Sequence, residues 1–220
     1  LLASEARLAS FFAIAKGDVP QSHWFRLGRL VVSVEGVPTL VSWSASMFEY
    51  LMPHLLMRSY PGTLLDQSCR MAVEQQIRYG RKRGVPWGIS ESAYNLVDRA
   101  GNFQYKAFGV PGLGLERGLS DVVVVAPYAT ALALMVAPEA ACLNLQRLAN
   151  EGLAGRFGLF EAVDYTPSRV PRGQERAVVR SFMAHHQGMS LLALGHLLND
   201  RPMQRRFESD PLFQATLLLL

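Results

Sequence analysis

The chain has 220 residues, of which half are hydrophobic and 18% are charged, and its formal net charge is +4. This composition is typical of a folded globular chain and excludes disorder, and the length suits one sizeable domain or part of a larger one. The basic residues are scattered, which argues against a nucleic-acid partner, and no apolar run is long and uninterrupted enough for a membrane span. The two cysteines lie far apart without metal-ligand spacing, so we expect buried free thiols, no metal and no cofactor.

The ends of the sequence carry no recognisable start or stop. The chain begins without Met or a signal peptide, and it stops within Leu217–Leu220, inside a helical pattern. We therefore expect it to be part of a longer protein, with no transmembrane segment among these residues.

The first quarter of the chain mixes helical and extended patterns. Apolar residues at helical spacing predict a helix over 4–15 that ends at Gly17, followed by a short helix over 18–27. Residues 30–40 favour an extended segment closed by a turn, and 43–53 form a further element that a proline ends.

The clearest helix covers residues 63–83. Thr63 followed by Asp66 resembles a capping box, apolar residues recur on one face, and Gly84 provides a left-handed stop. This helix leads into the most distinctive stretch of the chain, Gly84–Asn95, which reads Gly-Val-Pro-Trp-Gly-Ile-Ser-Glu-Ser-Ala-Tyr-Asn.

Two interpretations of Gly84–Asn95 stay open. In the first, Glu91 and the aromatic side chains of Trp87 and Tyr94 form a carbohydrate site, because aromatic faces stack on sugar rings and a carboxylic acid acts on a glycosidic oxygen. In the second, the stretch is a turn between helices, in which Ser90 caps the next helix and Glu91 lies in its first turn. Both interpretations use the same residue types.

The second half of the chain continues the helical pattern. A connection rich in glycine and aromatic residues covers 101–118 and, at that length, is expected to be functional or to pack over a site. Residues 122–136 are apolar on nearly every side and are predicted to form a buried inner helix, with 138–150 as its partner. A second aromatic turn, 158–167, carries two more acidic residues.

Residues 178–199 are predicted to form the last long helix, with a break at Gly188, and Asp210 starts another. His185 and His186 are adjacent, so on a helix they point about 100° apart and do not form the metal-binding pair that a spacing of four residues gives. We expect both to make hydrogen bonds to a sugar or to a carboxylate.

The helices fall into apolar and amphipathic members of pairs, as two concentric layers of helices require. We therefore predict an all-α fold, an α/α toroid whose site is built from loops at one rim. A helical bundle or solenoid is the alternative, although the sequence shows no fixed repeat period.

Five segments together resemble one known family. They are Phe48–Pro53, Ser59–Gln67, Gly84–Asn95, Gly158–Pro167 and Phe182–Ser190. In this order, and over essentially the whole chain, they resemble the glucoamylase-like domain of cyclic β-1,2-glucan synthases.

The resemblance implies an (α/α)6 barrel, of which residues 1–220 form the C-terminal part with no internal domain boundary. It implies a β-1,2-glucan chain as the substrate, which such a domain closes into a ring by retaining transglycosylation. Other parts of such a polypeptide are a membrane-embedded glycosyltransferase that lengthens the glucan and a phosphorylase-like region that adjusts its length. The resemblance therefore places the full-length protein at the bacterial inner membrane.

Carboxylates placed in aromatic turns are the catalytic candidates, because glycoside cleavage needs one protonated carboxyl and one carboxylate. Glu91 is our first choice, with Glu161 and Glu49 as candidate partners, and the sequence does not assign the acid and the nucleophile between them. The expected sugar contacts are Trp87, Tyr94, Asp164, His185, His186 and Gln187, with stacking surface from Trp43, Tyr50 and Tyr165. Core packing is the alternative role of each aromatic residue.

Two other functions stay open. Related domains are endo-β-1,2-glucanases, in which water takes the place of the sugar acceptor. The other is a non-catalytic glucan-binding module, which tolerates the loss of any single carboxylate. A membrane-spanning glycosyltransferase upstream and a phosphorylase-like region downstream distinguish a synthase from a glucanase.

Overall fold

The structure is a computed structural model that describes residues 1–220. The helices are α1 (Ala6–Ala15), α2 (Ser22–Arg26), α3 (Met47–Leu51), α4 (Leu64–Arg83), α5 (Pro127–Leu132), α6 (Pro138–Leu148), α7 (Ala184–Leu198), α8 (Pro202–Ser209) and α9 (Pro211–Thr216). Shorter helical turns are η1 (Met52–Leu55), η2 (Ala133–Met135), η3 (Ala149–Leu153) and η4 (Leu217–Leu219). The strands are β1 (Val31–Val34), β2 (Val37–Leu40), β3 (Ser92–Val97), β4 (Phe103–Lys106), β5 (Val124–Val125), β6 (Ala154–Gly155), β7 (Gly158–Leu159), β8 (Ala162–Asp164) and β9 (Ala177–Val179).

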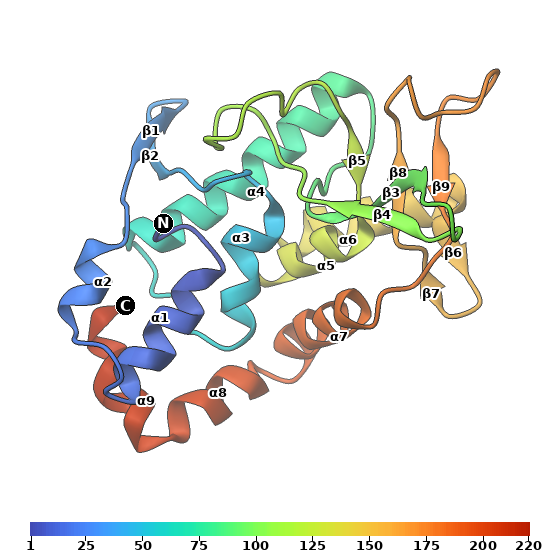
Figure 1. The fold of residues 1–220 in the computed structure, drawn as a ribbon. Helices are drawn as coiled ribbons and strands as arrows, with labels where there is room; N and C mark the ends of the chain where they lie inside the picture. The colour runs from blue at the N-terminus through green and yellow to red at the C-terminus, as the bar shows by residue number, and fades with distance from the viewer.

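The elements separate into two ends joined by central helices (Figure 1). The helices α1, α2, α8 and α9 gather at the end that holds both chain termini, and most of the short strands lie at the other. In between, α5 packs against α3, α6 and α7. The helix α7 runs from the strand-rich end towards α8, so it connects the two ends.

The predicted ends of α4 are confirmed. The side chain of Thr63 accepts a hydrogen bond from the backbone N–H of Asp66, which caps the first turn. Gly84 follows the last turn with a φ of 71°, a left-handed conformation that glycine adopts without steric cost. The long helix therefore begins and ends where its local sequence predicts.

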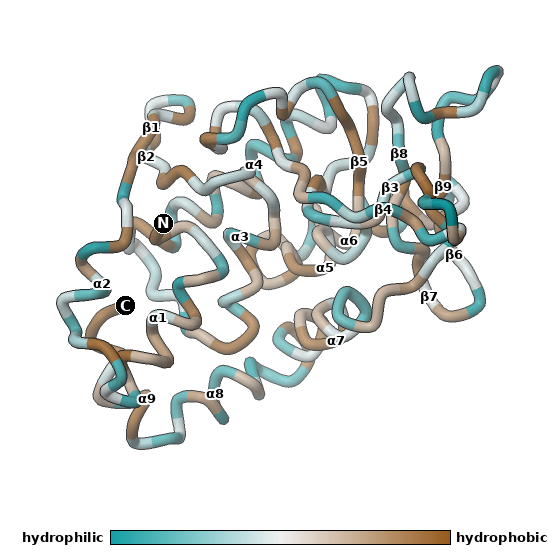
Figure 2. The backbone as a smooth tube through the Cα atoms, viewed as in Figure 1, coloured by the Kyte–Doolittle hydropathy of each residue, from teal (hydrophilic) through white to brown (hydrophobic).

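The apolar segment 122–136 is buried, as predicted, but only its second part is helical. Val124 and Val125 form β5, which pairs antiparallel with β8, and the helix starts at Pro127. β-Branched residues favour strands and proline favours the first turn of a helix, which explains the change at this point. Figure 2 shows β5 as hydrophobic, in contrast to the hydrophilic connection between β8 and β9.

The all-α prediction is wrong in detail, because the mainly helical chain also has nine short strands. After Ser90 the chain enters the β3–β4 hairpin, not a helix, and β9 occupies the start of the predicted helix over 178–199. Gly188 lies inside an unbroken α7. Strands β5, β8 and β9 form one sheet, and the (α/α)6 ring remains a prediction.

The two cysteines are both free but differ in burial. Cys69 is buried, and burial raises the pKa of its thiol to about 11. Cys142 is exposed, so the expectation of a buried thiol is wrong at that position. Among the helices, none is both long and apolar enough to cross a bilayer.

Candidate active site

The first turn of α1 is fastened to the centre of the molecule by a buried arginine. The Arg7 guanidinium donates hydrogen bonds to the carbonyl oxygens of Glu49 at 3.0 Å and Tyr50 at 2.6 Å, both on α3. It also donates to the carbonyl oxygen of Ser4 at 3.1 Å. These bonds fix the start of α1, and with it the carboxylate of Glu5, whose side chain accepts one hydrogen bond, from the Ser4 hydroxyl.

Glu91 lies directly before β3, and its backbone is held from two sides. The Tyr128 hydroxyl on α5 donates to the carbonyl oxygen of Glu91 at 2.9 Å, and it also contacts the hydroxyl of Ser90 at 2.8 Å. That Ser90 hydroxyl accepts a hydrogen bond from the backbone N–H of Phe48. Two helices therefore fix the position from which the Glu91 carboxyl projects.

The pKa of the Glu91 carboxyl is raised above its ordinary value of 4.5. Partial burial is the main cause, and the negative charge of Glu5 raises it further. A hydrogen bond from Tyr105 and the positive charge of His186 act in the opposite direction. A half-buried carboxyl with a raised pKa is suited to hold a proton and to donate it.

Glu161 and His186 form a buried acid–imidazole pair next to β3. The Nδ1 atom of His186 is 2.9 Å from each carboxylate oxygen of Glu161, and the backbone N–H of Ala93 donates to one of them at 3.1 Å. The other imidazole nitrogen, Nε2, is 3.2 Å from the Tyr105 hydroxyl. The Tyr128 ring stacks on the imidazole at 3.7 Å between ring centroids and an interplanar angle of 9°.

The structure thus brings Glu91, Glu161 and His186 together, as the sequence predicts. His185 joins them with its ring 4.0 Å from that of His186, and burial and the neighbouring charge lower its pKa. Tyr105, Tyr128 and Glu5 were not predicted from the sequence. The hairpin register places Tyr105 opposite Ala93, two residues after Glu91, so recognition of this hairpin was the missing signal.

Glu49 does not fit the catalytic role predicted for it. Its side chain is 7% exposed, and its carboxylate is surrounded by six donors. They are the hydroxyls of Ser42, Ser44 and Ser46 and the backbone N–H groups of Trp43, Ser44 and Ser46. A carboxylate with every lone pair engaged fixes the loop before α3 and is not free to act on a substrate.

Replacing Glu49 by alanine is expected to destabilise the fold by about 3 kcal/mol or more, because several buried donors lose their acceptor at once. Urea denaturation measures this change in the free energy of unfolding. The matched control is Glu74→Ala, which removes an exposed partner of Arg78 on α4 and should change little. A Glu49 variant as stable as this control would contradict the structural role.

Asp164 is a second predicted sugar contact that the structure assigns elsewhere. It is fully buried, and its carboxylate makes a two-pronged ion pair with Arg169, with N···O distances of 2.6 and 3.2 Å. The same guanidinium lies over the rings of Tyr94 and Phe108. Asp164 therefore presents no free surface to a sugar, and the half-buried Tyr94 packs in an aromatic and cationic cluster.

Three further aromatic residues predicted to contact sugar lie apart from the candidate site. Trp87 and Tyr50 are core residues, and the Tyr50 hydroxyl donates to the carbonyl oxygen of Leu40. Tyr165 donates to Glu151 at 2.7 Å. Burial in the core leaves Trp87 and Tyr50 no open face for a sugar, whereas the sugar contact of the half-buried Tyr165 stays a prediction.

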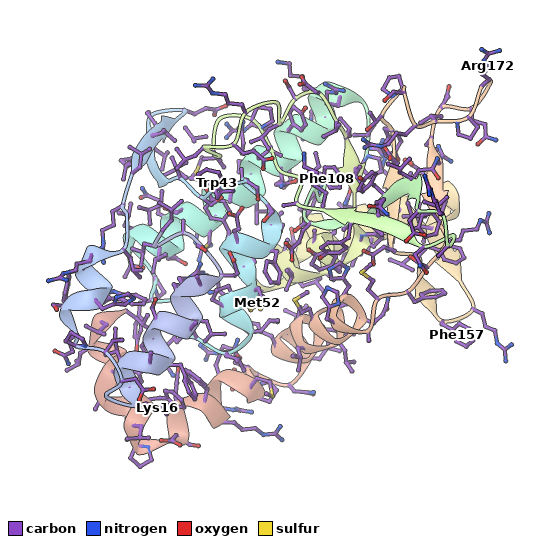
Figure 3. The ribbon with its side chains drawn as sticks, in the orientation of Figure 1. Lys16, Trp43, Met52, Phe108, Phe157 and Arg172 are labelled. Atoms are coloured by element: carbon purple, nitrogen blue, oxygen red, sulfur yellow. The ribbon has the colours of Figure 1, made fainter.

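Trp43 alone among the predicted stacking residues presents an open face. Its side chain is 62% exposed on the loop before α3, where Figure 3 labels it. Gln187 instead lines a cavity of about 320 Å³ between α5, α6 and α7. Most of its walls are apolar side chains, but Tyr128, Glu161 and His186 also line it, so the cavity borders the acid–imidazole pair. No group of three or more His, Cys, Asp or Glu side chains is arranged to hold a metal ion.

Comparison with known proteins decides the family. The Glycoamylase family model, described as "Putative glucoamylase", matches residues 1–211. The chain belongs to the Glycoamylase family. A curated relative of this Glycoamylase chain is the cyclic beta-(1,2)-glucan synthase NdvB of Rhizobium meliloti (strain 1021), which is 51% identical over all 220 residues. The match covers the whole chain but only 8% of that relative.

Solved structures with the same fold include two glucanases. An endo-beta-1,2-glucanase from Chitinophaga pinensis, in complex with sophorotriose and glucose, matches with a TM-score of 0.60 and 16% identity over 89% of the Glycoamylase chain and 47% of its own. A beta-1,2-glucanase from Parabacteroides distasonis matches with a TM-score of 0.60 and 17% identity over 99% of the chain and 30% of its own. At these identities the likeness shows the fold alone.

Proposed function

We propose that the chain is part of a carbohydrate-active domain that closes linear β-1,2-glucan into a ring by retaining transglycosylation. The observation that carries the proposal is a half-buried carboxyl, Glu91, whose pKa is raised by partial burial and further by the negative charge of Glu5. The substrate class rests on the 51% identity to a synthase of this glucan. The two glucanases of the same fold support it.

Glu5 replaces Glu161 and Glu49 as the proposed partner of Glu91. Glu49 has its carboxylate engaged by six donors, and the Glu161 carboxylate is held by His186 and the backbone N–H of Ala93. Glu5, in contrast, is partly exposed and bonded only to Ser4. Among the neighbouring charges, that of Glu5 affects the pKa of Glu91 most. We assign Glu91 as the general acid, because its raised pKa favours the protonated form, and Glu5 as the nucleophile.

The reaction then has two steps. The Glu5 carboxylate attacks the anomeric carbon while Glu91 protonates the departing 2-oxygen, which leaves a glycosyl group covalently attached to Glu5. The free 2-hydroxyl at the far end of the attached chain next attacks the same carbon. The Glu91 carboxylate accepts its proton, the ester to Glu5 breaks, and the ring is released with the original anomeric configuration.

We propose further that the chain works within a longer synthase polypeptide at a bacterial inner membrane. Its partners there are a membrane glycosyltransferase, which supplies the linear glucan, and a phosphorylase-like region, which adjusts its length. The small share of the synthase that the chain matches, 8%, supports this arrangement.

Product masses test the proposed function. The longer polypeptide incubated with linear β-1,2-glucan is expected to form products that weigh one water less than linear chains of equal length. Products that are all linear would favour the endo-β-1,2-glucanase function, which differs only in the acceptor. Binding without any turnover would favour a glucan-binding module.

A further inference from the structure

A second cavity, of about 240 Å³, lies at the opposite end of the central helices from Glu91. The first turns of α3, α5 and α7 hold the residues around the candidate active site. The cavity is lined instead by His54 of η1, Val136 after η2 and His196 near the end of α7. His186 and His196 are ten residues apart on α7, which is about 15 Å along a helix axis. Figure 1 shows this end of α7 beside α8, which forms a further wall.

Gln204 on α8 leaves a buried acceptor free in this cavity. Its side chain is 3% exposed, and its amide nitrogen bonds the carbonyl oxygen of His54 and the Nδ1 atom of His196. A carbonyl oxygen only accepts hydrogen bonds, so the amide nitrogen faces His54 and the amide oxygen faces away. That oxygen has no hydrogen-bond partner in the protein. Because an unsatisfied buried acceptor is costly, a bound molecule that donates a hydrogen bond would stabilise this arrangement.

Glu208 and His196 add a second free acceptor and a donor. One carboxylate oxygen of Glu208 lies 2.7 Å from the Arg58 guanidinium, and the other is buried without a partner. Since the Nδ1 atom of His196 accepts from Gln204, the neutral imidazole carries its proton on Nε2. Burial lowers the pKa of His196, which favours this neutral form. Gln204 and Glu208 thus each provide an acceptor, and His196 provides a donor.

The other walls are suited to a polar ligand with an apolar face. Arginine side chains line the cavity, and Met57, Met135 and Val136 form an apolar patch. A sugar ring has hydroxyls that donate and accept, together with C–H groups that pack on apolar side chains. We propose that this cavity is a second carbohydrate site, which holds one glucosyl unit of the glucan away from the reacting carboxyls. The identity of this ligand rests on the proposed function, and the volume suits one sugar unit more than a chain.

The charges around the cavity argue against an anion as the ligand. The free carboxylate oxygen of Glu208 would repel it. A neutral hydroxyl, in contrast, accepts from the remaining N–H groups of the arginines without breaking their ion pairs. Those ion pairs are Arg58–Glu208, Arg70–Asp66, Arg201–Asp200 and Arg205–Asp200.

A separate contact of this kind affects ring closure. When the reacting segment of the glucan leaves the candidate active site, a unit bound in the second cavity keeps the chain attached to the protein. The local concentration of the chain near Glu91 then stays high, because rebinding is intramolecular. The second site therefore favours completion of the ring over loss of the chain.

Calorimetric titration with the β-1,2-linked disaccharide of glucose tests the second site. The protein is the longer polypeptide with Glu91→Gln, which prevents turnover during the measurement. We expect two binding events. Adding Glu208→Gln should weaken one of them by about 10-fold or more, because the amide has a single acceptor oxygen and Arg58 engages it. Arg70→Gln, an exposed change at the same cavity, should weaken the same event several-fold and decides the question if Glu208→Gln does not fold.

The matched control is Glu74→Gln, which changes another carboxylate paired with an arginine and should keep both events. A single event that neither cavity variant affects would overturn the proposal, since the cavity then holds water only. Competition by inorganic phosphate for the second event would also overturn it, because the site would then be one for anions. Absence of the second event alone leaves the proposed function intact, whereas absence of both events contradicts the proposed substrate as well.

Discussion

Replacing Glu91 by glutamine is expected to lower kcat on linear β-1,2-glucan by roughly 10²–10⁴-fold, the usual contribution of a general acid. Glutamine keeps the size of the side chain and removes the proton that the leaving 2-oxygen needs. KM should change little, because the carboxyl acts on the transition state more than on the bound sugar. Initial rates of product formation at saturating glucan measure the effect.

Two comparisons make the Glu91 result specific. The control Glu139→Gln changes an exposed carboxyl in the first turn of α6 and should leave the rate unchanged. A β-linked substrate with a dinitrophenolate leaving group needs no protonation, so the first step on it should survive in Glu91→Gln. Equal losses on both substrates would contradict the assignment of Glu91 as the acid.

The pH profile of the native enzyme follows from the same assignment. Because burial and the charge of Glu5 hold the pKa of Glu91 above 4.5, the protonated acid persists to higher pH than for an exposed glutamate. The rate should fall as the pH rises through this raised value, and Glu91→Gln should lose that limb altogether. A limb that survives in the variant would belong to another group.

Local signals in the sequence predicted the elements that depend on neighbouring residues. The capped helix α4 and its glycine stop follow from Thr63 and Gly84 alone, and Asp210 caps α9 as expected. The hairpin β3–β4 was missed because Ser90 is also a good helix cap. In the structure its hydroxyl bonds Phe48 and Tyr128, which lie far away in the sequence.

The sequence predicts a site residue where a carboxylate lies within an aromatic turn. It does not predict the role of a carboxylate whose hydrogen-bond partners are distant in the sequence. Glu49 and Glu91 lie in similar local sequences, yet the serines around Glu49 bind its carboxylate and leave it no catalytic function. The carboxylate of Asp164 is likewise engaged, in an ion pair with Arg169. Glu5 has no local signal, because the start of α1 is fixed by contacts of Arg7 with α3, 42 and 43 positions away in the sequence.

Removal of the Glu5 carboxylate should have the largest effect of all. We expect Glu5→Ala to lower kcat by more than about 10⁴-fold, because the covalent glycosyl group has no other acceptor in the first step. A structural role for this side chain is excluded if urea denaturation shows the variant to be as stable as the native protein. Its only side-chain hydrogen bond, to Ser4, predicts that result.

Added azide then distinguishes the nucleophile from the acid by the configuration of the product. In Glu5→Ala, azide attacks the anomeric carbon directly and inverts it once, so an α-glycosyl azide is expected. In Glu91→Ala, the glycosyl group first forms on Glu5 and azide displaces it, so two inversions give the β-azide. The configuration is read from the coupling of the anomeric proton by NMR. A β-azide from Glu5→Ala would mean that Glu5 is the acid and Glu91 the nucleophile. Full activity of Glu5→Ala without azide would mean that another carboxylate is the nucleophile.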